Sequence, residues 1–107
     1  MILELREYVA LPGRAEDLHR RFAEETLDLF DEMDLDLRGF WHVAGERRRI
    51  VYLCAFAGVA EATAYWEAFR ADPRWIALKE RTEAAGPLIE DIVSTYLVEP
   101  DYAASRH

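Results

Sequence analysis

Apolar and polar residues follow the periodicity of β-strands in four segments of the chain. These segments predict strands at about residues 2–10, 36–44, 48–57 and 88–98. The third segment contains the run IVYLCAF at residues 50–56, which is almost wholly apolar and predicts a central strand covered on both faces. The short segment Gly45-Glu46-Arg47 precedes it and predicts a hairpin connection to the second strand.

Helical periodicity fills the intervals between these strands. A single buried face over residues 14–33 is formed by Leu18, Phe22, Leu29, Phe30 and Met33. A second helix is predicted at residues 59–71, and Asp72-Pro73 then supplies an N-cap and a first helical residue. The third helix runs to about Ala84, before Gly86 as a left-handed C-cap residue and Pro87 as a stop.

The order of elements is therefore β-α-β-β-α-(α)-β. It predicts an α+β domain of ferredoxin-like βαββαβ topology, with a four-stranded antiparallel sheet and helices on one face. We expect a single domain at residues 1–100 and a flexible C-terminal tail at residues 101–107. Apolar residues occupy both faces of the strands, yet only one helical layer is available. A second copy of the sheet is the natural cover for the other face, so we expect a homodimer.

Charge and composition narrow the classes of partner. The formal net charge is −8, which repels phosphate backbones and anionic membrane surfaces, so nucleic acid and membrane are not expected partners. The basic run Arg47–Arg49 is interpreted as a solvated hairpin tip, since no second basic cluster accompanies it. No apolar segment approaches the ~20 residues that span a bilayer. The lone Cys54 excludes an internal disulfide, and we expect a soluble, cytoplasmic protein in which Cys54 is an inert buried thiol.

Three stretches of the sequence resemble the NIPSNAP family, within the dimeric α/β-barrel superfamily. They are LELREYVALPG at residues 3–13, GFWHVAGERRRIVYLCAF at residues 39–56 and YWEAFRADPRW at residues 65–75. In the family the third strand often carries Trp where Cys54 stands here. The resemblance covers about residues 2–99 and implies a dimeric α/β barrel whose ligand cavity lies between helices and sheet. Relatives in the superfamily include cofactor-free monooxygenases and isomerases, as well as proteins without known chemistry.

Candidate catalytic residues are Arg6, Tyr8 and His42. Arg6 can orient an enolate or carboxylate, and Tyr8 can donate a hydrogen bond to a developing oxyanion. Their row with Glu4 on the first strand has an alternative interpretation, a structural network such as an Arg–carboxylate pair at a dimer interface. A neutral His42 can act as a general base near pH 7, or it can be a structural or exposed histidine at the sheet edge.

Aromatic residues supply the candidate ligand-binding side chains, which are Trp41, Tyr52, Trp66 and Trp75. The same residues can also be ordinary core. No spacing of His, Cys or carboxylates indicates a metal site, and no cofactor is expected.

Two functions remain open at this point. The first is a cofactor-independent enzyme of monooxygenase or isomerase type that acts on a small apolar or aromatic molecule. The second is a non-catalytic homodimer that binds a small ligand or a partner protein. A closed cavity with Arg6 or His42 at its wall would favour the first.

Overall fold

Four strands form one antiparallel sheet in the order β2–β3–β1–β4. The computed structural model describes residues 1–104. The strands are β1 (Ile2–Ala10), β2 (Asp36–Val43), β3 (Glu46–Phe56) and β4 (Ile89–Leu97). β1 lies between β3 and β4, and β2 pairs with β3 at one edge. The predicted α+β class and βαββαβ order are therefore confirmed.

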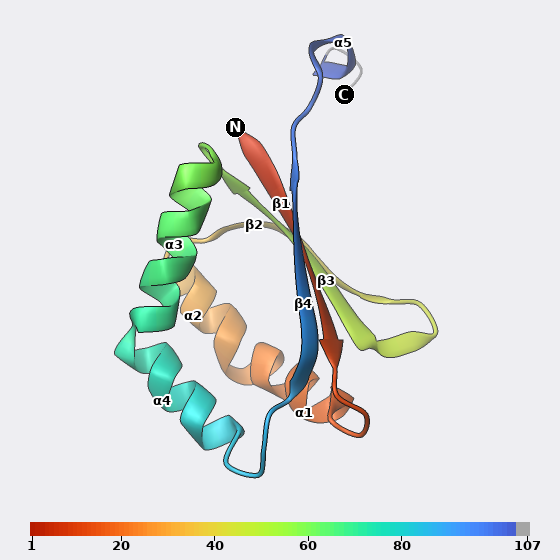
Figure 1. Ribbon diagram of the computed structural model, residues 1–107, viewed down its shortest axis with the longest axis vertical. Helices are drawn as coiled ribbons and strands as arrows, with labels where there is room; N and C mark the ends of the chain where they lie inside the picture. Colours follow the sequence, from red (N-terminus) through yellow and green to blue (C-terminus); the bar gives the residue numbers. More distant parts are fainter. Residues whose placement is uncertain (105–107) are drawn as a thin grey trace.

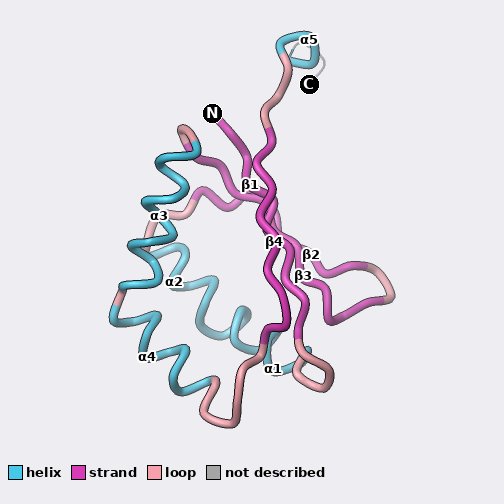
Figure 2. The backbone as a smooth tube through the Cα atoms, viewed as in Figure 1, coloured by secondary structure: helices cyan, strands magenta, loops and turns pink. Residues whose placement is uncertain are grey.

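The helices lie on one side of this sheet, as Figures 1 and 2 show. They are α1 (Ala15–Arg21), η1 (Phe22–Thr26), α2 (Leu27–Glu32), α3 (Val59–Ala71) and α4 (Pro73–Thr82). The first three form the single helix predicted at residues 14–33. Its middle turn, η1, is a π-helix, which a search for 3.6-residue periodicity did not predict.

Local signals set the ends of two elements. The Asp72 side chain accepts a hydrogen bond from the Arg74 backbone N–H at 2.8 Å, which confirms the predicted N-cap of α4. The β2–β3 connection is shorter than expected, because Val43 already pairs with Glu46 and only residues 44–45 form the turn. Gly45 accommodates the turn with φ of +78°. Glu46 and Arg47 therefore belong to β3 and not to a loop.

The strand register separates the two sheet faces. Arg6 on β1 lies opposite Tyr52 on β3 and Ser94 on β4, and the residues that share this face point towards the helices. This face builds the core, in which Ile50, Tyr52 and Cys54 are fully buried.

The opposite face of the sheet carries the residues that alternate with these along each strand. Leu5 and Leu53 are half-buried there, and Val93 is 46% exposed. Within residues 1–104 no helix covers this face. The prediction that apolar residues occupy both faces of the sheet is therefore confirmed.

A short helical segment follows β4. Residues Asp101–Ala104 form one helical turn, α5, which lies apart from the other helices (Figure 1). The remainder of the expected tail, residues 105–107, lies outside the described residues. Among the described helices, none has the length and apolar character that a membrane crossing requires.

Candidate active site between sheet and helices

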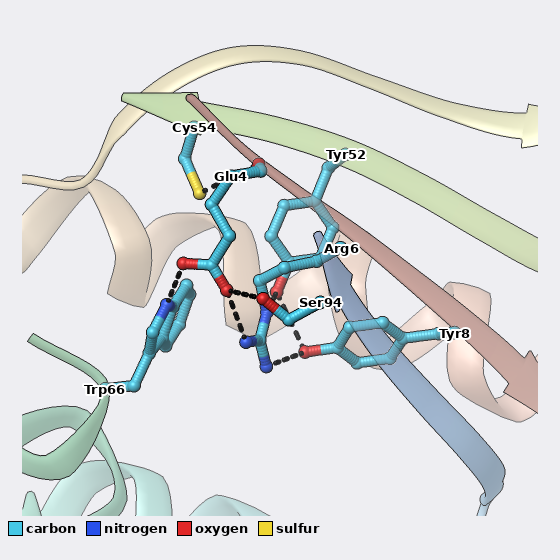
Figure 3. A network of polar contacts seen from close by, with 7 residues as sticks. All are labelled: Glu4, Arg6, Tyr8, Tyr52, Cys54, Trp66 and Ser94. Carbon is cyan, nitrogen blue, oxygen red and sulfur yellow. Dashed lines mark hydrogen bonds and ion pairs between the residues drawn. The ribbon is translucent and has the colours of Figure 1, made fainter. Parts of the chain in front are cut away.

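A buried carboxylate, Glu4, anchors a polar network on the helix side of the sheet (Figure 3). Glu4 is only 1% exposed. Its Oε1 accepts a hydrogen bond from Trp66 Nε1 at 2.8 Å, and its Oε2 accepts one from Ser94 Oγ at 2.6 Å. Arg6 completes the set with an ion pair to Oε2 at 3.1 Å. Three elements, β1, β4 and α3, therefore meet at one charged side chain, and each donor offsets part of the cost of burying it.

Arg6 distributes its hydrogen bonds over three neighbours. Its Nε donates to the Tyr52 hydroxyl at 2.9 Å and its Nη2 to the Tyr8 hydroxyl at 3.2 Å, in addition to the Glu4 contact. Burial acts to lower the pKa of Arg6, but Tyr8 and Tyr52 outweigh it, so this pKa is raised above its usual value. The guanidinium is therefore a permanent cation held in a fixed orientation.

The two tyrosine hydroxyls lie 2.8 Å apart, and either one can donate to the other. Both accept a hydrogen bond from Arg6, and Tyr52 is fully buried, so donation from Tyr52 to Tyr8 is the arrangement that gives the buried Tyr52 proton an acceptor. Burial also raises the pKa of Tyr52 well above its usual value, which keeps that proton in place. In that arrangement the Tyr8 proton can be donated to another acceptor.

A cavity of about 190 Å³ opens beside this network. Arg6 and Tyr8 line it from the sheet, and Trp66 and Trp75 line it from α3 and α4. The cavity therefore combines aromatic walls with a cation and a hydroxyl donor, the composition typical of small-molecule sites. An anionic oxygen placed there can accept hydrogen bonds from Tyr8 and from N–H groups of Arg6.

Thr26 adds an unsatisfied polar group to the same cavity. It belongs to the π-helical turn η1, lines the cavity and is 4% exposed. Its Oγ1 is buried and has no hydrogen-bond partner among the described residues. Buried hydroxyls are normally paired, and π-helical turns often occur at functional sites.

Arg21 and Glu83 close one side of the cavity. They form an ion pair at 2.9 Å between α1 and the residues after α4, and both line the cavity. Arg21 also lies over the Trp75 ring, with its Cζ 5.2 Å from the ring centre. This contact fixes the position of Trp75 relative to the first helix.

The structure brings together only part of the predicted site. Arg6, Tyr8, Trp66 and Trp75 line the cavity, whereas Tyr52 supports Arg6 and Tyr8 from the core without lining it. Glu4 and Arg6 do form the Arg–carboxylate pair of the alternative interpretation, a structural network, and both residues face the helices.

His42 shares the helix-facing side of the sheet but not the cavity. It pairs with Ile50 on β3, is exposed, and lies with its ring 5.7 Å from that of His19. Its Nδ1 contacts the backbone oxygen of Val43 at 3.1 Å. The structure therefore does not bring His42 to Arg6, and a general base at this position would act outside the cavity.

Trp41 lies on the other face of the sheet. It pairs with Val51, one position away from Phe40 and Tyr52, and is 53% exposed. Successive side chains of a strand point to opposite faces, so the side chain of Trp41 points away from the cavity. A ligand contact from Trp41 to this cavity is excluded by that geometry.

Three features of the site were not predicted from the sequence. These are the acceptor role of Glu4, the donor Ser94 and the unpaired Thr26. The position of Glu4 on the buried side of a strand could have indicated its acceptor role, because buried carboxylates need several donors. No sequence signal identified Ser94 or Thr26, since both depend on which elements pack together.

Cys54 behaves as predicted for a structural thiol. It is fully buried, and its Sγ donates to the Glu4 backbone oxygen at 3.7 Å. Burial raises the pKa of the Cys54 thiol to about 12, so the thiolate is absent at neutral pH. No group of three metal-ligating side chains occurs in residues 1–104.

Comparison with known proteins places this fold in a family. The NIPSNAP family model matches residues 3–103. An uncharacterised NIPSNAP domain protein from Burkholderia xenovorans is 26% identical, with 95% of this chain and 97% of that chain covered and a TM-score of 0.77. A NIPSNAP family protein from Agrobacterium tumefaciens is 20% identical, with 94% of each chain covered and a TM-score of 0.79.

A more distant likeness concerns the fold alone. A putative antibiotic biosynthesis monooxygenase from Nitrosomonas europaea is 13% identical, with 92% of this chain and 98% of that chain covered and a TM-score of 0.63. Among curated proteins, none matches this chain. The family match spans nearly all of the sheet and the helices that enclose the cavity, and the chain belongs to the NIPSNAP family.

Proposed function

We propose that this protein is a cofactor-independent enzyme, of monooxygenase or isomerase type, that acts on a small aromatic or apolar molecule bound between sheet and helices. The observation that carries the proposal is the position of Arg6, a buried permanent cation in the cavity wall. Three of its five N–H groups are used by described residues, which leaves two for a ligand. The likeness to a putative monooxygenase supports the fold on which such chemistry occurs.

The chemistry available at this site is stabilisation of an enolate. A carbonyl oxygen that gains negative charge as its α-carbon loses a proton would accept hydrogen bonds from Tyr8 and Arg6. Glu83 is the carboxylate in the cavity lining that could receive the proton. Return of the proton at a different carbon gives an isomerisation. Alternatively, the enolate carbon is oxidised by O₂ to a peroxide that takes up the proton, and loss of water by cleavage of its O–O and C–H bonds leaves a ketone.

A second candidate function is supported by a different observation. Glu83 is engaged by Arg21, and Glu4 is engaged by three donors. Within the described cavity lining, no carboxylate or imidazole is therefore unengaged and poised to remove a proton. This arrangement favours a protein that binds an enolate-like or phenolic ligand without converting it.

We also propose that the protein is a homodimer in which the two open sheet faces pack against each other. The support is the apolar character of that face, on which the half-buried Leu5 and Leu53 lie beside the exposed Trp41 and Val93. Stable soluble proteins rarely leave a contiguous apolar face of this kind in water. Each subunit would then keep its own cavity on the outer, helix-covered side.

The proposed location is the cytoplasm. The support is the single Cys54, which is buried as a thiol and has no cysteine to pair with in this sequence.

Benzoylacetone is a suitable probe, because it is small and aromatic and its enolate absorbs at longer wavelength than its neutral forms. We expect the protein to raise the enolate fraction at fixed pH, measured by absorbance. Tyr8→Phe should weaken this effect about tenfold, since a hydrogen bond to a charged oxygen contributes about 1.5 kcal/mol. Tyr102→Phe is the matched control, because Tyr102 is 80% exposed on α5.

Two further readouts separate the candidate functions. Faster exchange of the probe's α-hydrogen in D₂O, followed by NMR, or consumption of O₂ would support an enzyme. Binding with no change in either rate would support the non-catalytic alternative. Absence of any binding to the wild-type protein would refute a cavity for this class of molecule.

A further inference from the structure

Two cations in residues 1–104 stand out because no carboxylate pairs with them. Arg70 is the one arginine of these residues that lacks an ion pair, while the others each contact a carboxylate. Lys79 is the chain's single lysine, and it also has no ion pair within the described residues. The sequence has 21 acidic and 13 basic side chains, so carboxylates are in excess. An unpaired cation is therefore the exception in this protein.

Both of these cations line the same cavity. Arg70 comes from the last turn of α3 and Lys79 from the last turn of α4, and both side chains belong to the lining that includes Arg6 and Trp75. Arg70 and Lys79 are exposed, whereas Tyr8 and Thr26 in the same lining are buried. The two cations therefore stand at the solvent end of the cavity, and the buried residues Tyr8 and Thr26 line its inner end.

A second hollow on the outer surface adjoins the cavity through these residues. Arg70, Trp75 and Lys79 line both spaces, and Glu80 and Glu83 lie in the lining of the outer one. The charge of Glu83 is already matched by Arg21. The charge of Arg6 is likewise matched by Glu4, and Glu80 lines only the outer hollow, so the excess positive charge of the cavity itself comes from Arg70 and Lys79 at its mouth.

From this arrangement we propose that the natural ligand of the proposed site is an organic anion with an aromatic or apolar body and a carboxylate at one end. The body lies between Trp66 and Trp75, and the carboxylate lies at the mouth between Arg70 and Lys79. The enolisable or phenolic oxygen lies at the inner end, against Tyr8 and Arg6. This inference rests on the proposed function and adds the charged group by which the substrate class is recognised.

The arrangement also provides selectivity against neutral analogues. On a protein of net charge −8, an anion is repelled from most of the surface and attracted only where the local charge is reversed. An uncharged molecule with the same body loses the contacts with Arg70 and Lys79 and leaves both cations unpaired.

The test compares 4-(3-oxobutanoyl)benzoate, which is benzoylacetone with a para carboxylate, with its neutral methyl ester by titration calorimetry. For the wild-type protein we expect the acid to bind about tenfold more tightly than the ester, which corresponds to about 1.4 kcal/mol. The difference should shrink at high salt, because these cations are exposed. In the double variant Arg70→Gln/Lys79→Gln the acid and the ester should bind equally.

Arg81→Gln is the matched control, since it removes one charge from the same helix as Lys79 but does not touch the cavity. It should retain the preference for the acid. Equal binding of acid and ester by the wild type, while benzoylacetone itself binds, would overturn this inference and leave the proposed function standing. A double variant that keeps the preference for the acid would overturn it in the same way. Failure of all three compounds to bind would refute the proposed function, and this inference would fall with it.

Discussion

The guanidinium Cζ of Arg6 lies 4.1 Å from the centre of the Trp66 ring, while Nε1 of the same ring donates to Glu4 at 2.8 Å. Trp66 therefore contacts both members of the buried Glu4–Arg6 ion pair, one through its π face and the other through its N–H. Because Trp66 belongs to α3 and the ion pair to β1, this one side chain ties the helix layer to the central strand. The polar network thus holds the cavity wall in place.

Replacement of Glu4 by Gln should destabilise the protein strongly. Gln offers one acceptor oxygen in place of two, and it leaves the charge of Arg6 buried without a counter-ion. We expect the free energy of unfolding to fall by about 3 kcal/mol, measured by urea denaturation. Glu90→Gln removes only an exposed ion pair with Arg48 and should change stability by less than about 1 kcal/mol. An equally small effect of Glu4→Gln would contradict the role of Glu4.

The same substitution at two threonines should have opposite effects on stability. Thr26→Val removes a buried hydroxyl that has no partner in the described residues, so we expect the free energy of unfolding to rise by about 1 kcal/mol. Thr82→Val removes a hydroxyl that donates to Leu78 and accepts from Arg21, so we expect a loss of similar size. Thermal unfolding of both variants measures the difference, and a destabilised Thr26→Val would show that Thr26 is satisfied within the protein.

Substitutions at two neighbouring residues of β4 should distinguish effects on the proposed dimer interface from effects on the cavity. Val93 is 46% exposed on the open face, and Ile92 is 44% exposed in the cavity lining. Val93→Lys should produce monomers in light scattering, because it buries a charge between the two sheets. Ile92→Lys should leave the dimer intact. A wild-type protein that is monomeric at micromolar concentration would refute the dimer outright.

The N-cap of α4 should make stability depend on acidic pH. The Arg74 side chain and its backbone N–H hold the pKa of Asp72 at about 2, below its usual value of 3.8. A carboxyl with a lowered pKa in the folded state contributes stability above its unfolded pKa and loses it as the pH falls through the folded value.

Asp72→Asn isolates this contribution, because Asn can still cap the helix but cannot be charged. We expect the wild type to have the higher melting temperature at pH 5 and the two proteins to converge between about pH 4 and pH 2, the window that the two pKa values define. A melting-temperature difference that is the same at pH 5 and pH 2 would show that the charge of Asp72 contributes nothing.

Periodicity and caps were sufficient to predict the four strands and the main helices, although not the π-helical turn η1 or the short α5. The run of apolar residues around Tyr52 indicated a central strand, and Asp72-Pro73 marked the start of α4, because both signals act within a few residues of chain. Strand alternation also placed Arg6 and Tyr8 on a face opposite to that of Leu5. The apolar character of both faces followed from the same alternation.

The composition of the site, in contrast, was decided by tertiary structure. Arg6 meets Tyr52 and Ser94 only in the observed register, and a slip of one residue would have turned each of them to the other face. His42 lies on the same sheet face as Arg6 but outside the cavity, because its position along β2 sets it beside His19. Arg70 and Lys79 line one cavity because α4 follows α3 directly, with a bend at Asp72, and both helices lie on the same side of the sheet (Figure 1). The alternation of residues along a strand determines which way a side chain points. The packing of elements that are distant in the sequence determines which residues that side chain contacts.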